Sequence, residues 1–210
     1  MEKINNISEY WNNRYLNGGD SGVGSYGISA IYKAKIINFF IKKYNIKTIF
    51  DFGCGDGNQA SLFIGFEKYS GFDISSYIIE QCKIKFLNND RMNFTISIDD
   101  VDESDLCISF DVLYHIIDEE DFKDYLFYLF DKSKKYVVIF STDHNMNMKS
   151  AEHVYHRVFT KYIEKYHKNF KLIKIIKNPL ENNANLYLYK EKKKNIANLI
   201  YLIRNIKKYI

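Results

Sequence analysis

The feature that most constrains this chain is a cluster of glycines directly after a short apolar run. Residues 48–52 read Thr-Ile-Phe-Asp-Phe, and Gly53, Gly55 and Gly57 follow at alternate positions. An apolar run that stops at glycines is typical of a buried parallel strand that enters a tight turn. Glycine lets the backbone approach a ligand closely, and free amides at the start of a following helix can meet an anion. The sequence therefore predicts a nucleoside-binding turn after the first strand.

Strand and helix patterns alternate on both sides of this turn. Helical spacing of apolar residues predicts a helix over 29–44, a crossover helix over 57–65 and another helix over 121–130. Further short apolar runs predict strands at 69–74, 94–98, 106–110 and 136–140. This alternation indicates an α/β fold with a Rossmann-like, doubly wound and mostly parallel sheet.

The pattern changes beyond residue 160. A helix predicted over 161–168 precedes two apolar segments, 170–176 and 185–189, which a turn-rich stretch joins into a closing antiparallel hairpin. We expect one domain over residues 1–190. Residues 191–210 place apolar side chains at helical spacing beneath a lysine-rich face, which predicts a basic amphipathic helix. That helix is expected to pack on the body, form a homo-oligomer contact or lie on an anionic surface.

Charge is distributed unevenly along the chain. The 210 residues carry a formal net charge of +4, but residues 190–210 hold seven basic side chains and a single acidic one. The body is therefore slightly acidic and has no positive field for nucleic acid, so no nucleic-acid partner is expected. No segment approaches the roughly 20 apolar residues that span a bilayer and no leader pattern is visible, so we expect a cytoplasmic protein. The three cysteines lack metal-ligand spacing, so no metal site is expected.

An acidic residue after the second predicted strand supports the nucleoside site. Asp73 lies about 20 residues beyond Gly53, where a carboxylate can accept hydrogen bonds from both ribose hydroxyls. Ser75 and Ser76 follow it as predicted helix caps. Dinucleotide-binding folds favour a third glycine at the position of Asn58, which is absent here. The pattern therefore indicates a nucleoside-containing cofactor and departs from that of the dinucleotide binders.

The glycine run, read with Asp51 before it, closely resembles motif I of class I S-adenosylmethionine-dependent methyltransferases. The resemblance implies S-adenosyl-L-methionine as cofactor and S-adenosyl-L-homocysteine as product. In that family the glycine loop carries the methionine portion, the acid after the second strand holds the ribose, and residues after the third strand often contact adenine. The cofactor contacts implied in this sequence are Trp11, Arg14, Asp51, Gly53, Gly55, Gln59, Asp73, Ile74, Ile98, Asp99 and Asp111.

Four segments also resemble a narrower subgroup of these methyltransferases, found with bacterial surface-polysaccharide biosynthesis. They run from Tyr10 to Ser25, from Asp51 to Gln59, from Asp111 to His115 and from His153 to Thr160. The subgroup includes enzymes linked to the O-methyl phosphoramidate decoration of capsules. The resemblance implies a small-molecule or glycan-linked acceptor, with the phosphoramidate of a capsular polysaccharide as a specific case.

Candidate catalytic residues follow the fourth and fifth predicted strands. In the family, the segment that here ends in Tyr114 and His115 borders the transferable methyl group. A hydroxyl or N–H acceptor needs a base, and the histidine pKa lies nearest the working range, so His115 either takes that proton or packs on the cofactor. In a second cluster, Arg157 is expected to hold an anionic acceptor while His153 or His156 takes its proton.

Glycines between residues 18 and 27 make the amino-terminal stretch unsuited to a helix. We expect residues 1–28 to form a lid over the site, with Trp11, Arg14 and Tyr15 on its inner face. Two functions of other classes stay open. One is a nucleotide-dependent oxidoreductase or epimerase, and the other is a non-catalytic cofactor-binding module of the same fold.

Overall fold

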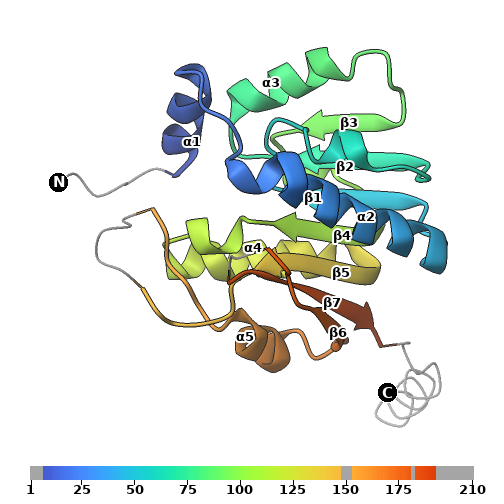
Figure 1. Cartoon of the computed structure of the whole chain (residues 1–210), viewed down its shortest axis with the longest axis vertical. Coiled ribbons are helices and arrows are strands. Elements are labelled where there is room, and N and C mark those ends of the chain that lie inside the picture. Colours follow the sequence, from blue (N-terminus) through green and yellow to red (C-terminus); the bar gives the residue numbers. More distant parts are fainter. Residues whose placement is uncertain (1–6, 148–152, 181–182, 193–210) are drawn as a thin grey trace, which may run out of the picture.

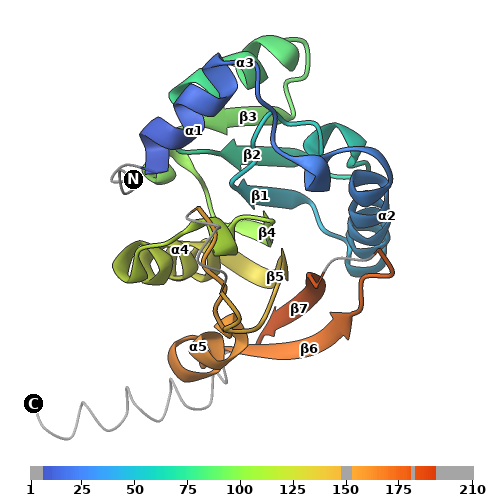
Figure 2. The same ribbon diagram turned by 60° about the vertical axis from the view of Figure 1, so that its left-hand side comes forward.

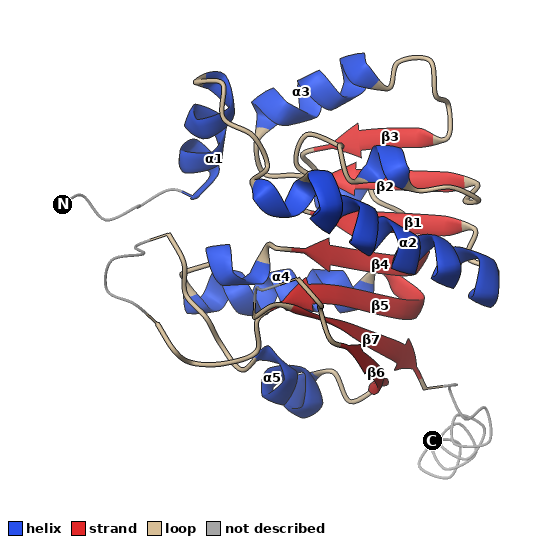
Figure 3. Cartoon of the chain, in the orientation of Figure 1, coloured by secondary structure: helices blue, strands red, loops and turns tan. Residues whose placement is uncertain are grey.

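A seven-stranded sheet with the order β3-β2-β1-β4-β5-β7-β6 organises the chain (Figure 1). The computed structural model describes residues 7–147, 153–180 and 183–192. The strands are β1 (Thr48–Phe52), β2 (Lys68–Phe72), β3 (Met92–Thr95), β4 (Ser104–Phe110), β5 (Ser133–Ser141), β6 (Phe170–Ile176) and β7 (Asn185–Glu191). The first five are parallel, and β7 runs antiparallel to both β5 and β6 (Figure 3). The predicted doubly wound sheet and its closing hairpin are confirmed.

Helices cover both faces of this sheet. They are α1 (Ile7–Leu16), α2 (Gly27–Tyr44), α3 (Ser76–Lys85), α4 (Glu119–Asp131) and α5 (Phe159–Tyr166). On one face α2 and α3 contribute Ile37, Phe40 and Ile79 to the buried core. On the other face α4 and α5 contribute Leu126 and Phe159 (Figure 2). Since successive side chains of a strand point to opposite faces, the buried apolar residues of β4 and β5 supply both cores.

The predicted crossover helix over 57–65 is wrong. Only a short 3₁₀ turn, Ala60–Leu62, forms between β1 and β2. Gly57 and Gly65 have φ angles of 68° and 87°, and this left-handed backbone cannot continue a right-handed helix at either end. Too few residues remain between them for a stable helix, so Ala60 and Phe63 fill the space as buried side chains. The first βα unit is therefore reduced to a compact loop.

The amino-terminal segment packs against the start of α3. Asn12 in α1 accepts hydrogen bonds from the Ser75 hydroxyl at 2.7 Å and from the Tyr77 amide at 3.3 Å. The Ser8 hydroxyl donates to the carbonyl of Ile74 at 2.9 Å. These contacts place α1 at the carboxyl edge of the parallel strands.

A carboxyl-terminal helix is predicted over residues 191–210. Glu191 is the last residue of β7, and residues 193–210 lie outside the described residues. None of the helices within the described ranges is long and apolar enough to cross a membrane.

The side chain of the buried residue Ser75 caps α3 and also holds α1 in place. Its hydroxyl accepts from the Ile78 amide and donates to Asn12. We expect Ser75→Ala to lower the free energy of unfolding by about 1–2 kcal/mol, because it removes a helix cap and a partner of Asn12. Urea unfolding measures this change. The exposed neighbour Ser76 provides the matched control, since Ser76→Ala should leave stability almost unchanged. Equal effects of the two substitutions would contradict the assignment of the cap.

Candidate functional site

A cavity of about 540 Å³ opens at the carboxyl edge of the parallel strands. Its walls come from the segments that follow β1, β2 and β4, from α2 and α4, and from the amino-terminal segment. Strand β1 lies between β2 and β4, which is the switch point where open α/β sheets bind ligands. Predicted site residues among its lining are Trp11, Asp51, Gly53, Gly55, Gln59, Asp73, Ile74, Asp111, Tyr114 and His115.

The glycine loop is packed too tightly to accept side chains. Gly53 has a φ angle of 87°, and a Cβ atom there would lie 2.5 Å from Val112. A Cβ atom on Gly55 would lie 2.4 Å from the Ser21 hydroxyl oxygen. Segments that are distant in sequence therefore close on the loop from two sides, and glycine is required for that approach.

The amides of this loop are engaged within the protein, which corrects the expectation of free amides at a helix start. The Gly55 amide donates to Asp73 at 3.0 Å, and the Asp56 amide donates to the Ser21 hydroxyl at 3.0 Å. The Asn58 amide donates to the side chain of Asp56 at 2.8 Å. No α-helix begins here, so the loop lacks the unsatisfied amides and the dipole that the start of a helix would provide. The loop provides close backbone contact and does not form an anion site at a helix end.

Asp73 connects the glycine loop to α3. One carboxylate oxygen accepts from Gly55, and the other accepts from the Ser75 amide at 3.0 Å. Burial raises the pKa of Asp73 to about 6, although the amide hydrogen bonds act in the opposite direction. Asp73 lines the cavity, and a carboxylate has about four lone-pair sites, so it has the capacity to accept from a diol as well.

Asp51 lies at the floor of the cavity. Its carboxylate accepts from the Tyr69 hydroxyl at 2.8 Å and is 3% exposed. Burial raises the pKa of Asp51 to about 7, although the hydrogen bond from Tyr69 acts in the opposite direction.

A buried ion pair on the cavity wall was missed by the sequence analysis. The ammonium group of Lys33 donates to Asp111 at 2.7 Å, and the Tyr114 hydroxyl donates to the other Asp111 oxygen at 2.8 Å. The signal was present, since Lys33 shares the buried face of α2 with Ala30 and Ile37 at helical spacing. A lysine on an apolar helix face indicates a buried partner.

Gln59 carries an unpaired acceptor. Its side-chain nitrogen donates to the carbonyl of Ala30 at 3.1 Å, but its buried oxygen Oε1 has no partner among the described residues. A buried polar atom without a partner costs free energy, so a ligand with a donor at this place would be favoured.

His115 is held in one orientation by the loop after β5. Its Nδ1 lies 3.1 Å from the carbonyl oxygen of His153, and its ring contacts Trp11 edge-on at a centroid distance of 5.3 Å. Burial lowers the pKa of His115, which favours the neutral ring at pH 7. With Nδ1–H donating to His153, the other ring nitrogen Nε2 is left as a proton acceptor.

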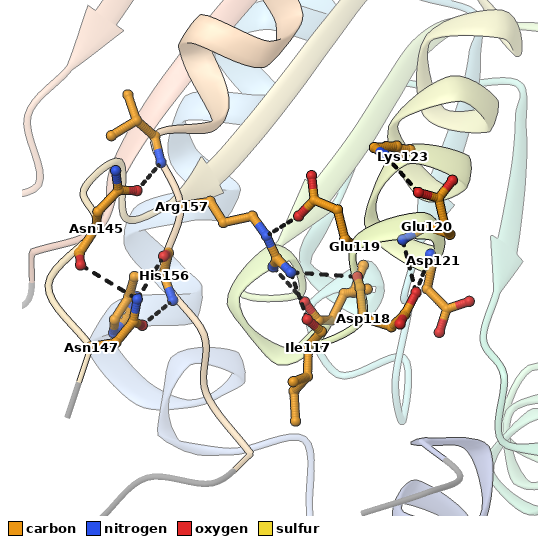
Figure 4. A network of polar contacts seen from close by, with 12 residues as sticks. Ile117, Asp118, Glu119, Glu120, Asp121, Lys123, Asn145, Asn147, His156 and Arg157 are labelled. Carbon is orange, nitrogen blue, oxygen red and sulfur yellow. Dashed lines mark hydrogen bonds and ion pairs between the residues drawn. The ribbon is translucent and has the colours of Figure 1, made fainter. Parts of the chain in front are cut away.

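Arg157 does not line the cavity, contrary to the expectation that it holds an acceptor. Figure 4 shows its guanidinium group directed at Glu119 and at the carbonyls that precede α4. It donates to the carbonyls of Ile116 and Ile117, both at 2.6 Å. Because its donors are engaged there, Arg157 fixes the loop before α4.

The two histidines of the second predicted cluster lie outside the cavity lining. His156 bonds Thr142 through Nδ1 at 2.7 Å, and Asn147 brackets its backbone (Figure 4). The ring of His153 is exposed and stacks on His115 at 5.8 Å. His153 therefore contacts His115, whereas the ring of His156 lies 5.7 Å from that of Tyr114.

Three further predicted contacts are not on the cavity wall. Strand β3 ends at Thr95, and the following turn packs Ile98 against the apolar core and leaves Asp99 exposed. Arg14 donates to the carbonyl of Asp20 at 2.7 Å.

Among the described residues, no group of histidine, cysteine and acidic side chains is placed to hold a metal ion.

Comparison with known proteins identifies the fold. No family model matches the sequence, and no curated protein is significantly similar to it. The N-methyltransferase NodS from Bradyrhizobium japonicum, solved with S-adenosyl-L-homocysteine, has a TM-score of 0.72 at 12% identity, over 90% of this chain and 100% of its own.

Two other solved structures show the same arrangement. Magnesium protoporphyrin IX methyltransferase from Synechocystis, also with bound S-adenosyl-L-homocysteine, has a TM-score of 0.68 at 13% identity and covers 89% of this chain and 98% of its own. The mitomycin 7-O-methyltransferase has a TM-score of 0.59 at 12% identity, over 78% of this chain and 54% of its own. These matches do not bear on the polysaccharide-associated subgroup. At such identities they show architecture, and the chain therefore has the fold of class I S-adenosylmethionine-dependent methyltransferases.

Proposed function

We propose that this protein transfers a methyl group from S-adenosyl-L-methionine to a small or carbohydrate-linked acceptor. The observation that carries the proposal is the cavity at the switch point of the sheet, where Asp73 and the loop of Gly53 and Gly55 share one wall. Solved proteins with this fold bind the demethylated cofactor, which supports the same choice of ligand.

The lining fits a nucleoside with an amino-acid arm. Asp73 would accept from the ribose hydroxyls, since a carboxylate at the end of the second strand is suited to a diol. The apolar side chains of Phe72 and Ile74 beside it offer a surface for a base. Across the glycine loop, the unpaired oxygen of Gln59 would accept from an amino group. A plain sugar would leave the apolar surface uncovered, and an inorganic anion would bring no donor to Asp73 and Gln59.

The cofactor, when bound, supplies a methyl group already activated by a sulfonium. The protein then has to align the acceptor and exclude water. Trp11, Tyr15 and residues 21–25 line the cavity, and we propose that the amino-terminal segment acts as a lid over both ligands.

His115 is the proposed base. It lines the cavity, its ring is neutral by preference, and its Nδ1 is committed to the His153 carbonyl. An acceptor hydroxyl or N–H group near Nε2 would therefore lose its proton to that nitrogen as the methyl group is transferred. Tyr114, held by Asp111, would shape the acceptor side of the cavity next to it.

The acceptor we propose is a carbohydrate-linked hydroxyl or amide nitrogen, with the phosphoramidate of a capsular polysaccharide as the specific candidate that the sequence resemblance suggests. Asp121 and Asp124 of α4 contribute carboxylates to the cavity lining. Since Arg157 is engaged elsewhere, these carboxylates favour an acceptor without a second negative charge near its reacting atom. The fold itself does not distinguish oxygen from nitrogen acceptors.

The cofactor assignment is tested by calorimetry with S-adenosyl-L-homocysteine. Asp73→Asn should weaken binding by about tenfold or more, because charge-assisted hydrogen bonds to the sugar are lost. Asp99→Asn serves as control, and it should bind like the wild type since Asp99 is exposed and outside the cavity. The proposal fails if wild-type protein takes up neither S-adenosyl-L-methionine nor its demethylated product.

The base is tested by the pH dependence of methyl transfer from labelled S-adenosyl-L-methionine into glycan-precursor extracts. Because burial lowers the pKa of His115 and the base must be neutral, activity should persist below pH 6.5 and fall only as the pH drops through that lower pKa. His115→Ala should reduce kcat by about 10²-fold or more while cofactor binding is retained. His144→Ala, outside the cavity lining, should leave the profile unchanged. An unaltered profile in the His115 variant would exclude this role.

A further inference from the structure

Lys33 is a buried cation in the wall of the cavity. Its side chain is 1% exposed, and Asp111 at 2.7 Å is the hydrogen-bond partner that the described residues provide for it. Its ammonium group lies 5.3 Å from the ring centre of Phe110 and 5.0 Å from that of Phe140. An ammonium group has three donors, and aromatic faces only partly replace water around it. Donor capacity therefore remains at a position that lines the cavity.

The partner of Lys33 is held in a strained conformation. Asp111 follows β4 with a φ angle of 60°, a left-handed value that is uncommon outside glycine. A Cβ atom on Gly24 would lie 2.5 Å from an Asp111 carboxylate oxygen, so the amino-terminal segment closes directly over the ion pair. Such strain persists where the surroundings over-determine it, often beside a ligand. The amino-terminal segment and the ion pair therefore meet on the wall of the cavity.

Gln59 supplies an independent observation on the same wall. Its unpaired oxygen Oε1 is buried, and its nitrogen is fixed on Ala30, one helical turn before Lys33 in α2. The cavity wall thus combines a cation with spare donors, a carboxylate and an amide acceptor. A zwitterionic group, with one carboxylate and one ammonium, satisfies all three.

The order of the strands determines which end of the ligand reaches Lys33. Asp73, Gly53 and Asp111 follow β2, β1 and β4, which are neighbours in the sheet. Two strand spacings separate the outer pair, roughly 10 Å. A nucleoside whose sugar is held at Asp73 and whose arm crosses Gly53 therefore directs that arm toward Lys33.

We propose that Lys33 binds the carboxylate of the amino-acid arm of S-adenosyl-L-methionine, and that Asp111 and Gln59 accept hydrogen bonds from its ammonium group. This inference rests on the proposed function and assigns the arm to a lysine of the helix that precedes the first strand. The carboxylate would take the donors of Lys33 that Asp111 leaves open, so the existing ion pair and the ligand form one alternating set of charges.

The test compares two nucleosides on the full chain by calorimetry. S-adenosyl-L-homocysteine carries the amino-acid arm, whereas 5′-methylthioadenosine keeps the adenosine and the thioether but lacks it. Lys33→Met should weaken S-adenosyl-L-homocysteine binding by roughly tenfold to a hundredfold, because a charged hydrogen bond is lost. Its affinity for 5′-methylthioadenosine should stay within about twofold.

Lys35→Met is the matched control, since Lys35 is exposed on the same helix and should bind both nucleosides like the wild type. Lys33→Met leaves the Asp111 carboxylate without its cation, so the double variant Lys33→Met with Asp111→Asn keeps the wall neutral. Because Asp111 is also a proposed partner of the ligand ammonium group, the double variant should show a selective loss of S-adenosyl-L-homocysteine binding at least as large as that of Lys33→Met. Equal weakening of both nucleosides would assign Lys33 a purely structural role and overturn the inference, as would unchanged binding of both. Wild-type protein that binds neither nucleoside would refute the proposed function itself.

Discussion

The candidate site depends on the hydrogen bonds that the Asp73 carboxylate accepts. This carboxylate accepts from the amides of Gly55 and Ser75, and so joins the glycine loop after β1 to the first turn of α3. Ser75 in turn caps α3 and donates to Asn12 of α1, so it links the amino-terminal segment to Asp73. Burial of this carboxylate raises its pKa, and the amide donors offset part of that cost. One side chain thus connects the glycine loop, the start of α3 and, through Ser75, the amino-terminal segment that lines the cavity.

The shortened connection between β1 and β2 explains why the amino-terminal segment is so closely involved. Without a crossover helix, the loop has no helix end to order it, and hydrogen bonds with side-chain and backbone groups of residues 21–26 order it instead. Ser21 accepts from the Asp56 amide, Asn58 donates to the carbonyl of Ser25, and Tyr26 bonds the carboxylate of Asp56. The amino-terminal segment and the glycine loop are therefore joined by these hydrogen bonds, and both line the cavity.

The cavity wall carries two acidic side chains at one place and an ion pair at another. Asp51 and Asp73 lie at the ends of β1 and β2, while Lys33 and Asp111 form a pair beside the end of β4. A cationic methyl donor with a zwitterionic arm matches this distribution better than a dinucleotide, whose pyrophosphate would meet carboxylates and engaged amides. His115 lines the same cavity, and burial lowers its pKa, which favours the neutral ring at pH 7.

The sequence alone determined the sheet, the closing hairpin and the place of the glycine turn, because these depend on local patterns of apolar residues and on the conformations that glycine allows. It also indicated Asp73 and His115, which follow strands and so lie at one edge of the sheet. Only the tertiary structure decided which side chains face the cavity. Arg157 is directed at backbone carbonyls, the turn after β3 withdraws Asp99, and Lys33 points inward to Asp111. These outcomes depend on partners far away in the chain, and a pattern of neighbouring residues carries no record of such distant contacts.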